Sequence, residues 1–112
     1  MHTPLLGGAL LAWMSMVCAC GAEPLYVVKI QGRQFVPQQT ELPSGVKLRI
    51  VLENQDDIAE EFGSPPLHRT AVLAPGSRVT LSIGPLDPGR YLFRTANSTE
   101  RGSCALGVFV VR

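Results

Sequence analysis

The amino-acid sequence predicts an all-β domain built as an antiparallel β-sandwich. Three observations lead to this prediction. Short segments in which apolar and polar residues alternate recur along the chain, and this is the period of a half-buried β-strand. Turn segments that contain Pro and Gly separate them, as in "LPSGV", "APGS" and "DPGR". No long stretch has the period of a helix.

Five strands are expected, and each is predicted by its own pattern. The segment 25–31, "LYVVKIQ", is rich in β-branched and aromatic residues. The segment 46–53, "VKLRIVLE", places apolar residues on one face and charged residues on the other. "RVTLSI" at 78–83 and "RYLFRT" at 90–95 alternate in the same way. "GVFVVR" at 107–112 is apolar on both faces, as expected of a central strand.

Length and charge limit the classes of function. The chain has 112 residues, which is one domain at most. It has 10 basic and 9 acidic residues and a net charge of +1, which argues against nucleic acid as a partner. The sequence contains no phosphate-binding loop, no dinucleotide-binding glycine pattern and no zinc-type Cys or His pairing. It therefore assigns no catalytic residues.

The first part of the chain is typical of a secretory leader. Residues 1–22 contain no Asp, Glu, Lys or Arg, and an apolar run is followed there by small residues. We therefore expect residues 1–22 to be a signal peptide, residues 23–112 to be the mature domain, and the protein to lie in the periplasm or cell envelope. Two processing routes remain open: cleavage before Glu23, or a lipoprotein leader that ends before Cys20, which would then carry a lipid anchor. Either route leaves Cys104 without a partner for a disulfide.

Three segments resemble a known family. "FVPQQTELPSGVKLRIVLENQD" (35–56) and "GPLDPGRYLF" (84–93) resemble segments of cupredoxin-like domains, and "EEFGSPPLHR" (60–69) resembles the Glu-Glu-Phe-x-Ser motif of one branch. That branch comprises small exported cupredoxin-like proteins associated with bacterial iron-permease uptake systems. The resemblance implies a Greek-key β-sandwich of the cupredoxin type over 23–112. It also implies a periplasmic role in handling or oxidising iron, with an envelope iron-uptake permease or a companion periplasmic protein as partner.

The same resemblance argues against a blue-copper site. Such a site needs two His, a Cys thiolate and usually an axial Met. At the position of the first His stands Glu60 or Glu61, and at the position of the Cys stands Thr95. The following loop, "ANSTERGSCALG", has neither His nor Met. The mature domain contains no Met, which also argues against a copper chaperone that would use Cys104.

Carboxylates in place of soft ligands favour a different metal. Carboxylate oxygens suit harder ions such as ferrous iron better than cuprous copper. The candidate ligands of a non-blue site for a divalent metal, iron or copper, are Glu60, Glu61, His68 and Glu100. Adjacent residues of an extended segment point to opposite faces, so only one of the two glutamates is expected to face the site.

Two alternatives remain open. The acidic segment 56–61 is also typical of a solvated loop. The branch usually has a Glu-Lys pair after the Arg of "LHR" and a His after the Tyr strand, whereas this chain has Thr70 and Ala71 and no such His. A metal-free binding module that kept the scaffold without redox chemistry is therefore the alternative function.

Three further residues have a structural interpretation. Tyr91 follows a Pro-Gly pair, where a sandwich often fixes a Tyr hydroxyl to nearby backbone. We expect Phe62 to fill the core. We expect Cys104, beside the small Ala105, to be a buried apolar side chain.

Overall fold

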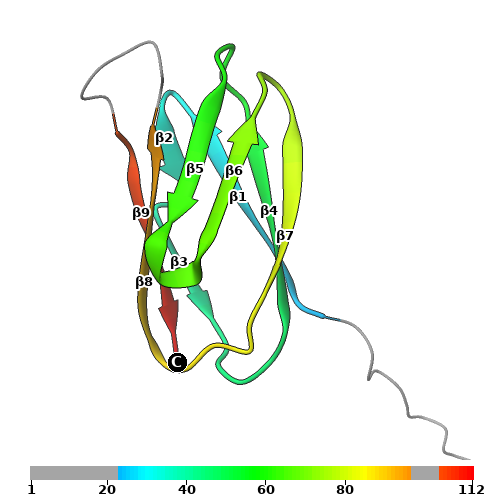
Figure 1. The fold of residues 1–112 in the computed structure, drawn as a ribbon, viewed down its shortest axis with the longest axis vertical. Coiled ribbons are helices and arrows are strands. Elements are labelled where there is room, and N and C mark those ends of the chain that lie inside the picture. The colour runs from blue at the N-terminus through cyan, green and yellow to red at the C-terminus, as the bar shows by residue number, and fades with distance from the viewer. Residues whose placement is uncertain (1–22, 97–103) are drawn as a thin grey trace, which may run out of the picture.

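A computed structural model describes residues 23–96 and 104–112, which form a β-sandwich of two sheets (Figure 1). One sheet has the strand order β2-β1-β4-β7, and the other has the order β3-β9-β8-β5-β6. The elements are β1 (Leu25–Gln31), β2 (Gln34–Val36), β3 (Gln39–Leu42), β4 (Leu48–Asn54), β5 (Glu60–Ser64), the 3-10 helix η1 (Pro65–Leu67), β6 (Arg69–Leu73), β7 (Arg78–Ile83), β8 (Gly89–Ala96) and β9 (Leu106–Val111). None of the described residues forms a helix long and apolar enough to cross a membrane.

The predicted Greek-key β-sandwich is confirmed, but two of its strand pairs are parallel rather than antiparallel. β1 runs parallel to β4, and β3 runs parallel to β9. Consecutive strands often lie in different sheets, for example β2 and β3, so that neighbours within a sheet are distant in sequence. An alternating pattern shows which face of a strand is buried, and it carries no information on the direction of the neighbouring strand.

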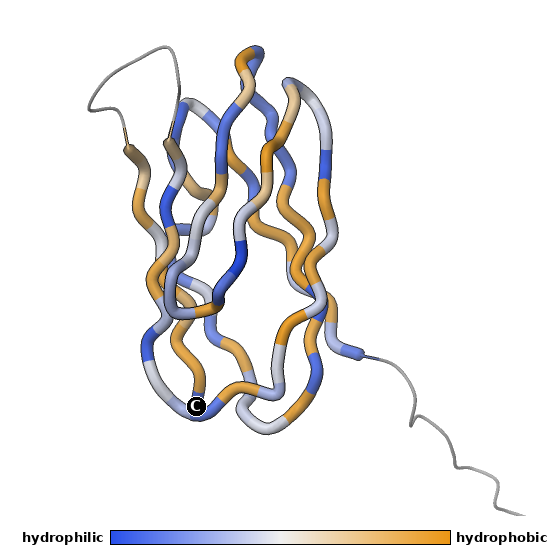
Figure 2. The backbone as a smooth tube through the Cα atoms, viewed as in Figure 1, coloured by the Kyte–Doolittle hydropathy of each residue, from blue (hydrophilic) through white to orange (hydrophobic). Residues whose placement is uncertain are grey.

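The five expected strands are present, with small shifts at their ends. β1 and β7 have the predicted bounds, while β4 begins at Leu48 and leaves Val46 outside the strand and 41% exposed. Figure 2 shows how apolar and polar residues alternate along these strands. The sequence did not predict β2, β3, β5 and β6. β5 matters most, because Glu60 and Glu61 were expected in a loop and instead begin a strand that pairs with β6 and β8.

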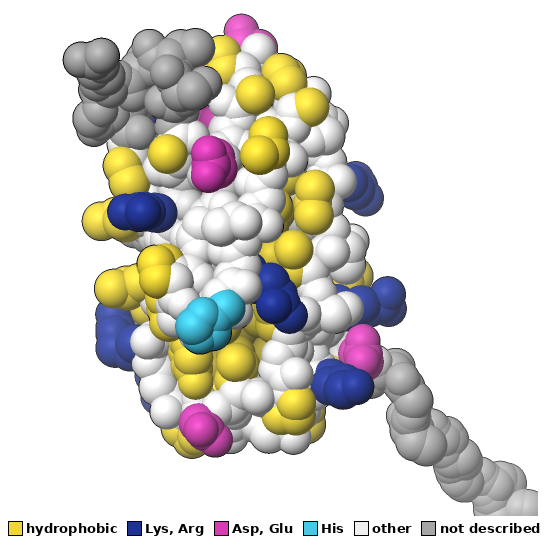
Figure 3. Space-filling view, viewed as in Figure 1, with side chains coloured by type: hydrophobic (Ala, Val, Ile, Leu, Met, Phe, Trp, Pro, Cys, Tyr) yellow, Lys and Arg dark blue, Asp and Glu magenta, His cyan; other side chains and the backbone are white. Residues whose placement is uncertain are grey.

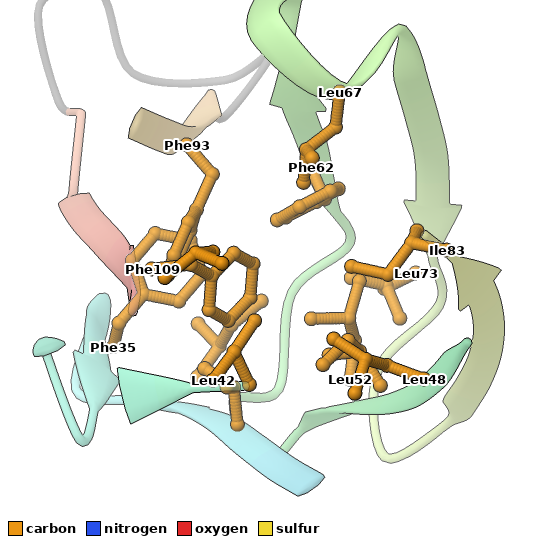
Figure 4. Packing of buried hydrophobic residues seen from close by; sticks show 14 residues of the cluster. Phe35, Leu42, Leu48, Leu52, Phe62, Leu67, Leu73, Ile83, Phe93 and Phe109 are labelled. Atoms are coloured by element: carbon orange, nitrogen blue, oxygen red, sulfur yellow. The ribbon is translucent and has the colours of Figure 1, made fainter. Parts of the chain in front are cut away.

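Four phenylalanines form the centre of the core (Figure 4). The ring of Phe93 lies 4.6 Å from that of Phe35, 5.6 Å from that of Phe62 and 4.4 Å from that of Phe109, measured between centroids. The Phe35 and Phe93 rings meet edge to face, a favourable geometry for aromatic pairs. Phe62 is completely buried, which confirms its predicted role. The cluster joins β2 in the four-stranded sheet to three strands of the other sheet.

The turn before β8 is fixed by a tyrosine. The Tyr91 hydroxyl donates a hydrogen bond of 2.8 Å to the backbone carbonyl of Asp87, four residues earlier. This is the expected backbone anchor of a sandwich corner. It sets the path by which the chain crosses from β7 to β8.

Gly107 offers a test of this packing. A Cβ atom there would collide with the Phe93 ring and lie 3.1 Å from the carbonyl oxygen of Gln38. We expect Gly107→Ala to lower the free energy of unfolding by about 1–3 kcal/mol, because the added Cβ would have to displace the buried Phe93 ring. Gly63→Ala is the control, since a Cβ there meets nothing within 4 Å. Urea unfolding of both variants measures the difference, and equal stabilities would contradict the proposed packing.

Candidate metal centre at the loop end of the sandwich

Three turns gather at one end of the sandwich: those between β1 and β2, β4 and β5, and β6 and β7 (Figure 1, top). Asn54, the last residue of β4, holds two of them together. Its side-chain amide donates to the carbonyl of Ile58 at 2.8 Å, of Leu73 at 3.1 Å and of Ala74 at 3.3 Å. The side chain is almost completely buried, so these bonds are protected from competition by water.

Asp56 attaches the third turn. Its two carboxylate oxygens accept hydrogen bonds from the backbone N–H groups of Gly32 at 2.7 Å and Arg33 at 2.8 Å. Both of those residues have φ of +62°, so their successive N–H groups converge on one anion. The Asp56 N–H in turn donates to the Asn54 side chain at 3.0 Å. Asp56 is therefore a structural clamp, and the acidic segment is not simply solvated.

Glu60 is the unusual residue at this end. It is the first residue of β5 and is only 3% exposed. Its Oε2 atom has no hydrogen-bond partner among the described residues. Burial raises the pKa of this carboxyl above 4.5, the nearby Asp56 charge raises it further, and Arg33 acts in the opposite direction. A buried carboxylate without a partner is unfavourable, and a bound cation or proton would relieve it.

Glu61 and His68 lie on the other face of the same sheet. Glu61 is exposed, as the alternation along a strand requires. His68 ends the 3-10 helix in the left-handed region, with φ of 55°, and is also exposed. The two side chains line one groove of about 430 Å³ on the outer face of the five-stranded sheet. The structure thus brings Glu61 and His68 to one groove and places Glu60 on the opposite side of the sheet.

The fourth candidate, Glu100, lies outside the described residues. Within 23–96 and 104–112, no three His, Cys, Asp or Glu side chains come close enough to hold a metal ion together. Arg33 lies on a distant turn but close enough to Glu60 to affect its charge, and no motif in the sequence connects the two residues. The only signal for it was the "QGRQ" turn between the first two strands.

Thr95 and Cys104 stand where the chain leaves β8 and enters β9. Thr95 is buried; its N–H donates to the Ala105 carbonyl at 3.0 Å, and its hydroxyl oxygen accepts from the Ala105 N–H at 3.4 Å. Cys104 is exposed, so the prediction of a buried thiol was wrong. It precedes the first residue of β9, Leu106, and therefore lies before the strand enters the core.

The raised pKa of Glu60 predicts how stability varies with pH. The folded state holds the Glu60 proton more tightly than the unfolded chain does, so this contribution is complete below pH 4.5 and is lost as the pH rises through the folded pKa. In Glu60→Gln the side-chain amide stays neutral at every pH, so the variant does not lose this stability as the pH rises. We expect the stability of the variant relative to wild type to increase with pH in urea unfolding series from about pH 4 to 8.

Glu61→Gln, at an exposed position of the same strand, is the matched control. If the two variants follow the same pH profile, burial of Glu60 has no consequence for stability.

Comparison with known proteins identifies the family. A family model of the cupredoxin-like domain matches residues 5–105. An uncharacterized protein of Rickettsia prowazekii (strain Madrid E) is 38% identical over 64 residues, which are 57% of this chain and 51% of that protein. The chain thus spans about half the length of this curated relative.

Solved structures agree at the level of the fold. A reduced auracyanin from Roseiflexus castenholzii matches with a TM-score of 0.65 and 14% identity, over 82% of this chain and 99% of that chain. The metal-binding domain of the Cu(I)-exporting ATPase CopA of Streptococcus pneumoniae, solved with Cu(I), matches with a TM-score of 0.62 and 12% identity, over 79% and 84%. At these identities the likeness shows the fold alone. With the family model matching most of its length, the chain belongs to the cupredoxin-like domain family.

Proposed function

We propose that this chain is a non-blue cupredoxin-like protein of the bacterial cell envelope that handles a divalent metal, above all iron, through Glu60. The observation that carries this proposal is the buried Glu60 carboxyl, whose Oε2 atom has no partner among the described residues. Such a group is retained at a cost in stability unless something binds it. A metal ion bound at this carboxylate would remove that cost.

The chemistry of the donors decides which metal fits. Glu60 and Asp56 offer carboxylate oxygens, and the Asp56 oxygens already accept two backbone hydrogen bonds. Oxygen donors suit ferrous, manganous or other hard and borderline ions, with water completing the coordination. At the positions where the resemblance places the Cys and the first His of a blue-copper site stand Thr95 and Glu60 or Glu61, which supply neither thiolate nor imidazole. By the chemistry of these donors, a weak oxygen-donor site completed by water is the kind of site proposed here, and a blue-copper site is not.

Proton release accompanies metal binding at such a site. The pKa of Glu60 is raised, so the carboxyl holds its proton to higher pH than an exposed glutamate. A metal ion must displace that proton before it can bind. We therefore expect affinity to rise with pH, while the positive charge of Arg33 nearby limits how tightly a cation is held.

Export and iron uptake complete the proposal. The uncharged apolar segment 1–22 supports secretion, with the mature domain at 23–112 or a lipid anchor at Cys20. The "EEFGS" motif supports a partnership with an iron-uptake permease of the envelope or a companion periplasmic protein. Iron would be the cargo, and the protein would present or deliver it.

A metal-free binding module is the second candidate. It is favoured by the absence of any three clustered ligands within the described residues and by the structural role of Asp56. In that case the buried Glu60 would be left over from a metal site that the protein has lost, and the outer surface of the sandwich would carry the function.

Metal titration separates the two candidates. We expect the purified protein to bind ferrous and manganous ions in anaerobic calorimetry. Glu60→Gln should weaken binding by about tenfold or more, because losing even an outer-shell partner of a metal weakens binding by about 10–100-fold. Glu61→Gln is the matched control and should leave affinity unchanged, because Glu61 faces the other side of the sheet. With cupric ion we expect no intense visible band, since no thiolate site is formed.

Three outcomes would contradict the proposal. If neither ion binds the wild type, the metal-free module replaces it. If Glu61→Gln weakens binding and Glu60→Gln does not, the metal lies in the outer groove. A strong blue colour that disappears in Cys104→Ser would instead establish a copper–thiolate site.

Processing is tested by mass spectrometry. We expect protein isolated from the envelope to begin at Glu23, or at a lipidated Cys20, because the leader has the composition that export machinery removes. The intact mass distinguishes the two, since a lipid adds to the mass of the chain that begins at Cys20. Mature protein that retains Met1 would overturn the proposal of export with cleavage.

A further inference from the structure

The outer face of the five-stranded sheet has an apolar centre. On β8 and β9, strand register places Leu92 opposite Val108 and Arg94 opposite Leu106. Leu92 is 57% exposed and Leu106 is 59% exposed. Large apolar side chains that lie side by side at the surface often mark a contact site.

These side chains line a hollow. It has a volume of about 330 Å³, and its walls include Leu92, Leu106, Pro65 and Pro66. η1, which contains both prolines, forms one wall, so the hollow has a rigid side. The hollow is large enough for one aliphatic or aromatic side chain, and it is open to solvent.

Basic side chains surround this hollow. Arg90 and Arg94 line it, and the neighbouring groove, which shares Pro65 and Arg94 with it, is lined also by Arg69 and His68. Figure 3 shows a face of the molecule on which Lys and Arg side chains and a His lie among apolar side chains. Arg94 and Arg90 take part in no ion pair among the described residues.

The floor of the groove is also open. Gly63 lies opposite Arg94 across β5 and β8, and a Cβ atom there would meet nothing within 4 Å. The Arg69 guanidinium donates to the carbonyl of Ser82 at 3.0 Å, which holds it at the edge of the sheet without neutralising its charge. Glu61 is the one acidic residue that lines either depression in the described part of the chain.

We propose that this surface, which we call the Arg94 face and which consists of Arg69, Arg90, Leu92, Arg94, Leu106, Pro65 and Pro66, docks an acidic segment of a partner protein. One apolar side chain of that segment enters the hollow between Leu92 and Leu106. Its carboxylates pair with the surrounding arginines, whose forked guanidinium groups suit carboxylates. Charge complementarity selects the partner, because apolar contact alone would accept any exposed apolar side chain.

The Arg94 face does not depend on metal binding. It lies on the outer side of the sheet, while Glu60 is buried on the inner side. Glu60→Gln should therefore leave docking unchanged, so the failure of one proposal is distinguishable from the failure of the other.

A blocked peptide with the sequence acetyl-Asp-Glu-Leu-Phe-Asp-Glu-amide serves as the probe. It is titrated into the purified, isotope-labelled protein and followed by amide chemical shifts. We expect saturable binding, with shifts concentrated on β8, β9 and η1. Arg94→Gln should weaken binding by about tenfold, the factor expected for losing a charge-assisted hydrogen bond. Leu92→Ser, tested as a separate variant, should weaken peptide binding more than Arg94→Gln does.

Matched controls separate docking from general attraction. Lys47→Gln removes one positive charge from an exposed position before β4, in the other sheet, and should leave affinity unchanged. A peptide with Ser-Ser in place of Leu-Phe, and one with Lys in place of each acid, should both lose binding. Amide chemical shifts of free Arg94→Gln that match those of the free wild type away from residue 94 show that this variant folds.

Three outcomes overturn the proposal. The first is no saturable binding of the acidic peptide below about 1 mM, the range of weak but specific contacts. The second is equal weakening by Lys47→Gln and Arg94→Gln, which would mean unspecific attraction. The third is binding to vesicles of anionic phospholipid without binding to the peptide, which would assign the face to a membrane surface.

Discussion

The register of β5 between β8 and β6 decides which side chains face the interior. Phe62 lies opposite Thr95 on one neighbour and Ala71 on the other, and its ring belongs to the central aromatic cluster. A slip of one residue would turn this ring to solvent and bury Glu61. Burial of one phenylalanine thus forces Glu60 inward although its own burial is unfavourable. The same constraint leaves the outer side of β5 open as a groove.

Alternation in the sequence predicted strands that have one buried face, and it failed at β5, which begins with two glutamates. β4 and β7 were predicted because their apolar residues recur at every second position. β5 was missed because it opens with Glu60 and Glu61, residue types that are rare in strands. Its strand conformation comes from pairing with two neighbours, one of which is more than thirty residues away along the chain. Tertiary pairing of this kind leaves no local signal.

The sequence predicted only part of the candidate site, because a local pattern does not show which distant segments meet in space. The opposite orientation of Glu60 and Glu61 follows from extended geometry alone, and the structure shows it. The clamp of Asp56 on the turn at Gly32 joins residues that no sequence spacing connects. Cys104 was misplaced because its small apolar neighbour suggested burial, whereas the position of a strand boundary decides exposure.

The pairing of β3 with β9 has a consequence for the order in which the molecule can assemble. β9 lies between β3 and β8, so it is the strand that joins β3 to the rest of the five-stranded sheet. Until that strand is available, β3 has no neighbour in its sheet and the Phe93 ring lacks the Phe109 ring against which it packs. Contacts between segments so distant in sequence slow folding. The sandwich is therefore complete only once β9 has paired with both neighbours, and until then the side of β3 that β9 covers stays accessible to other chains.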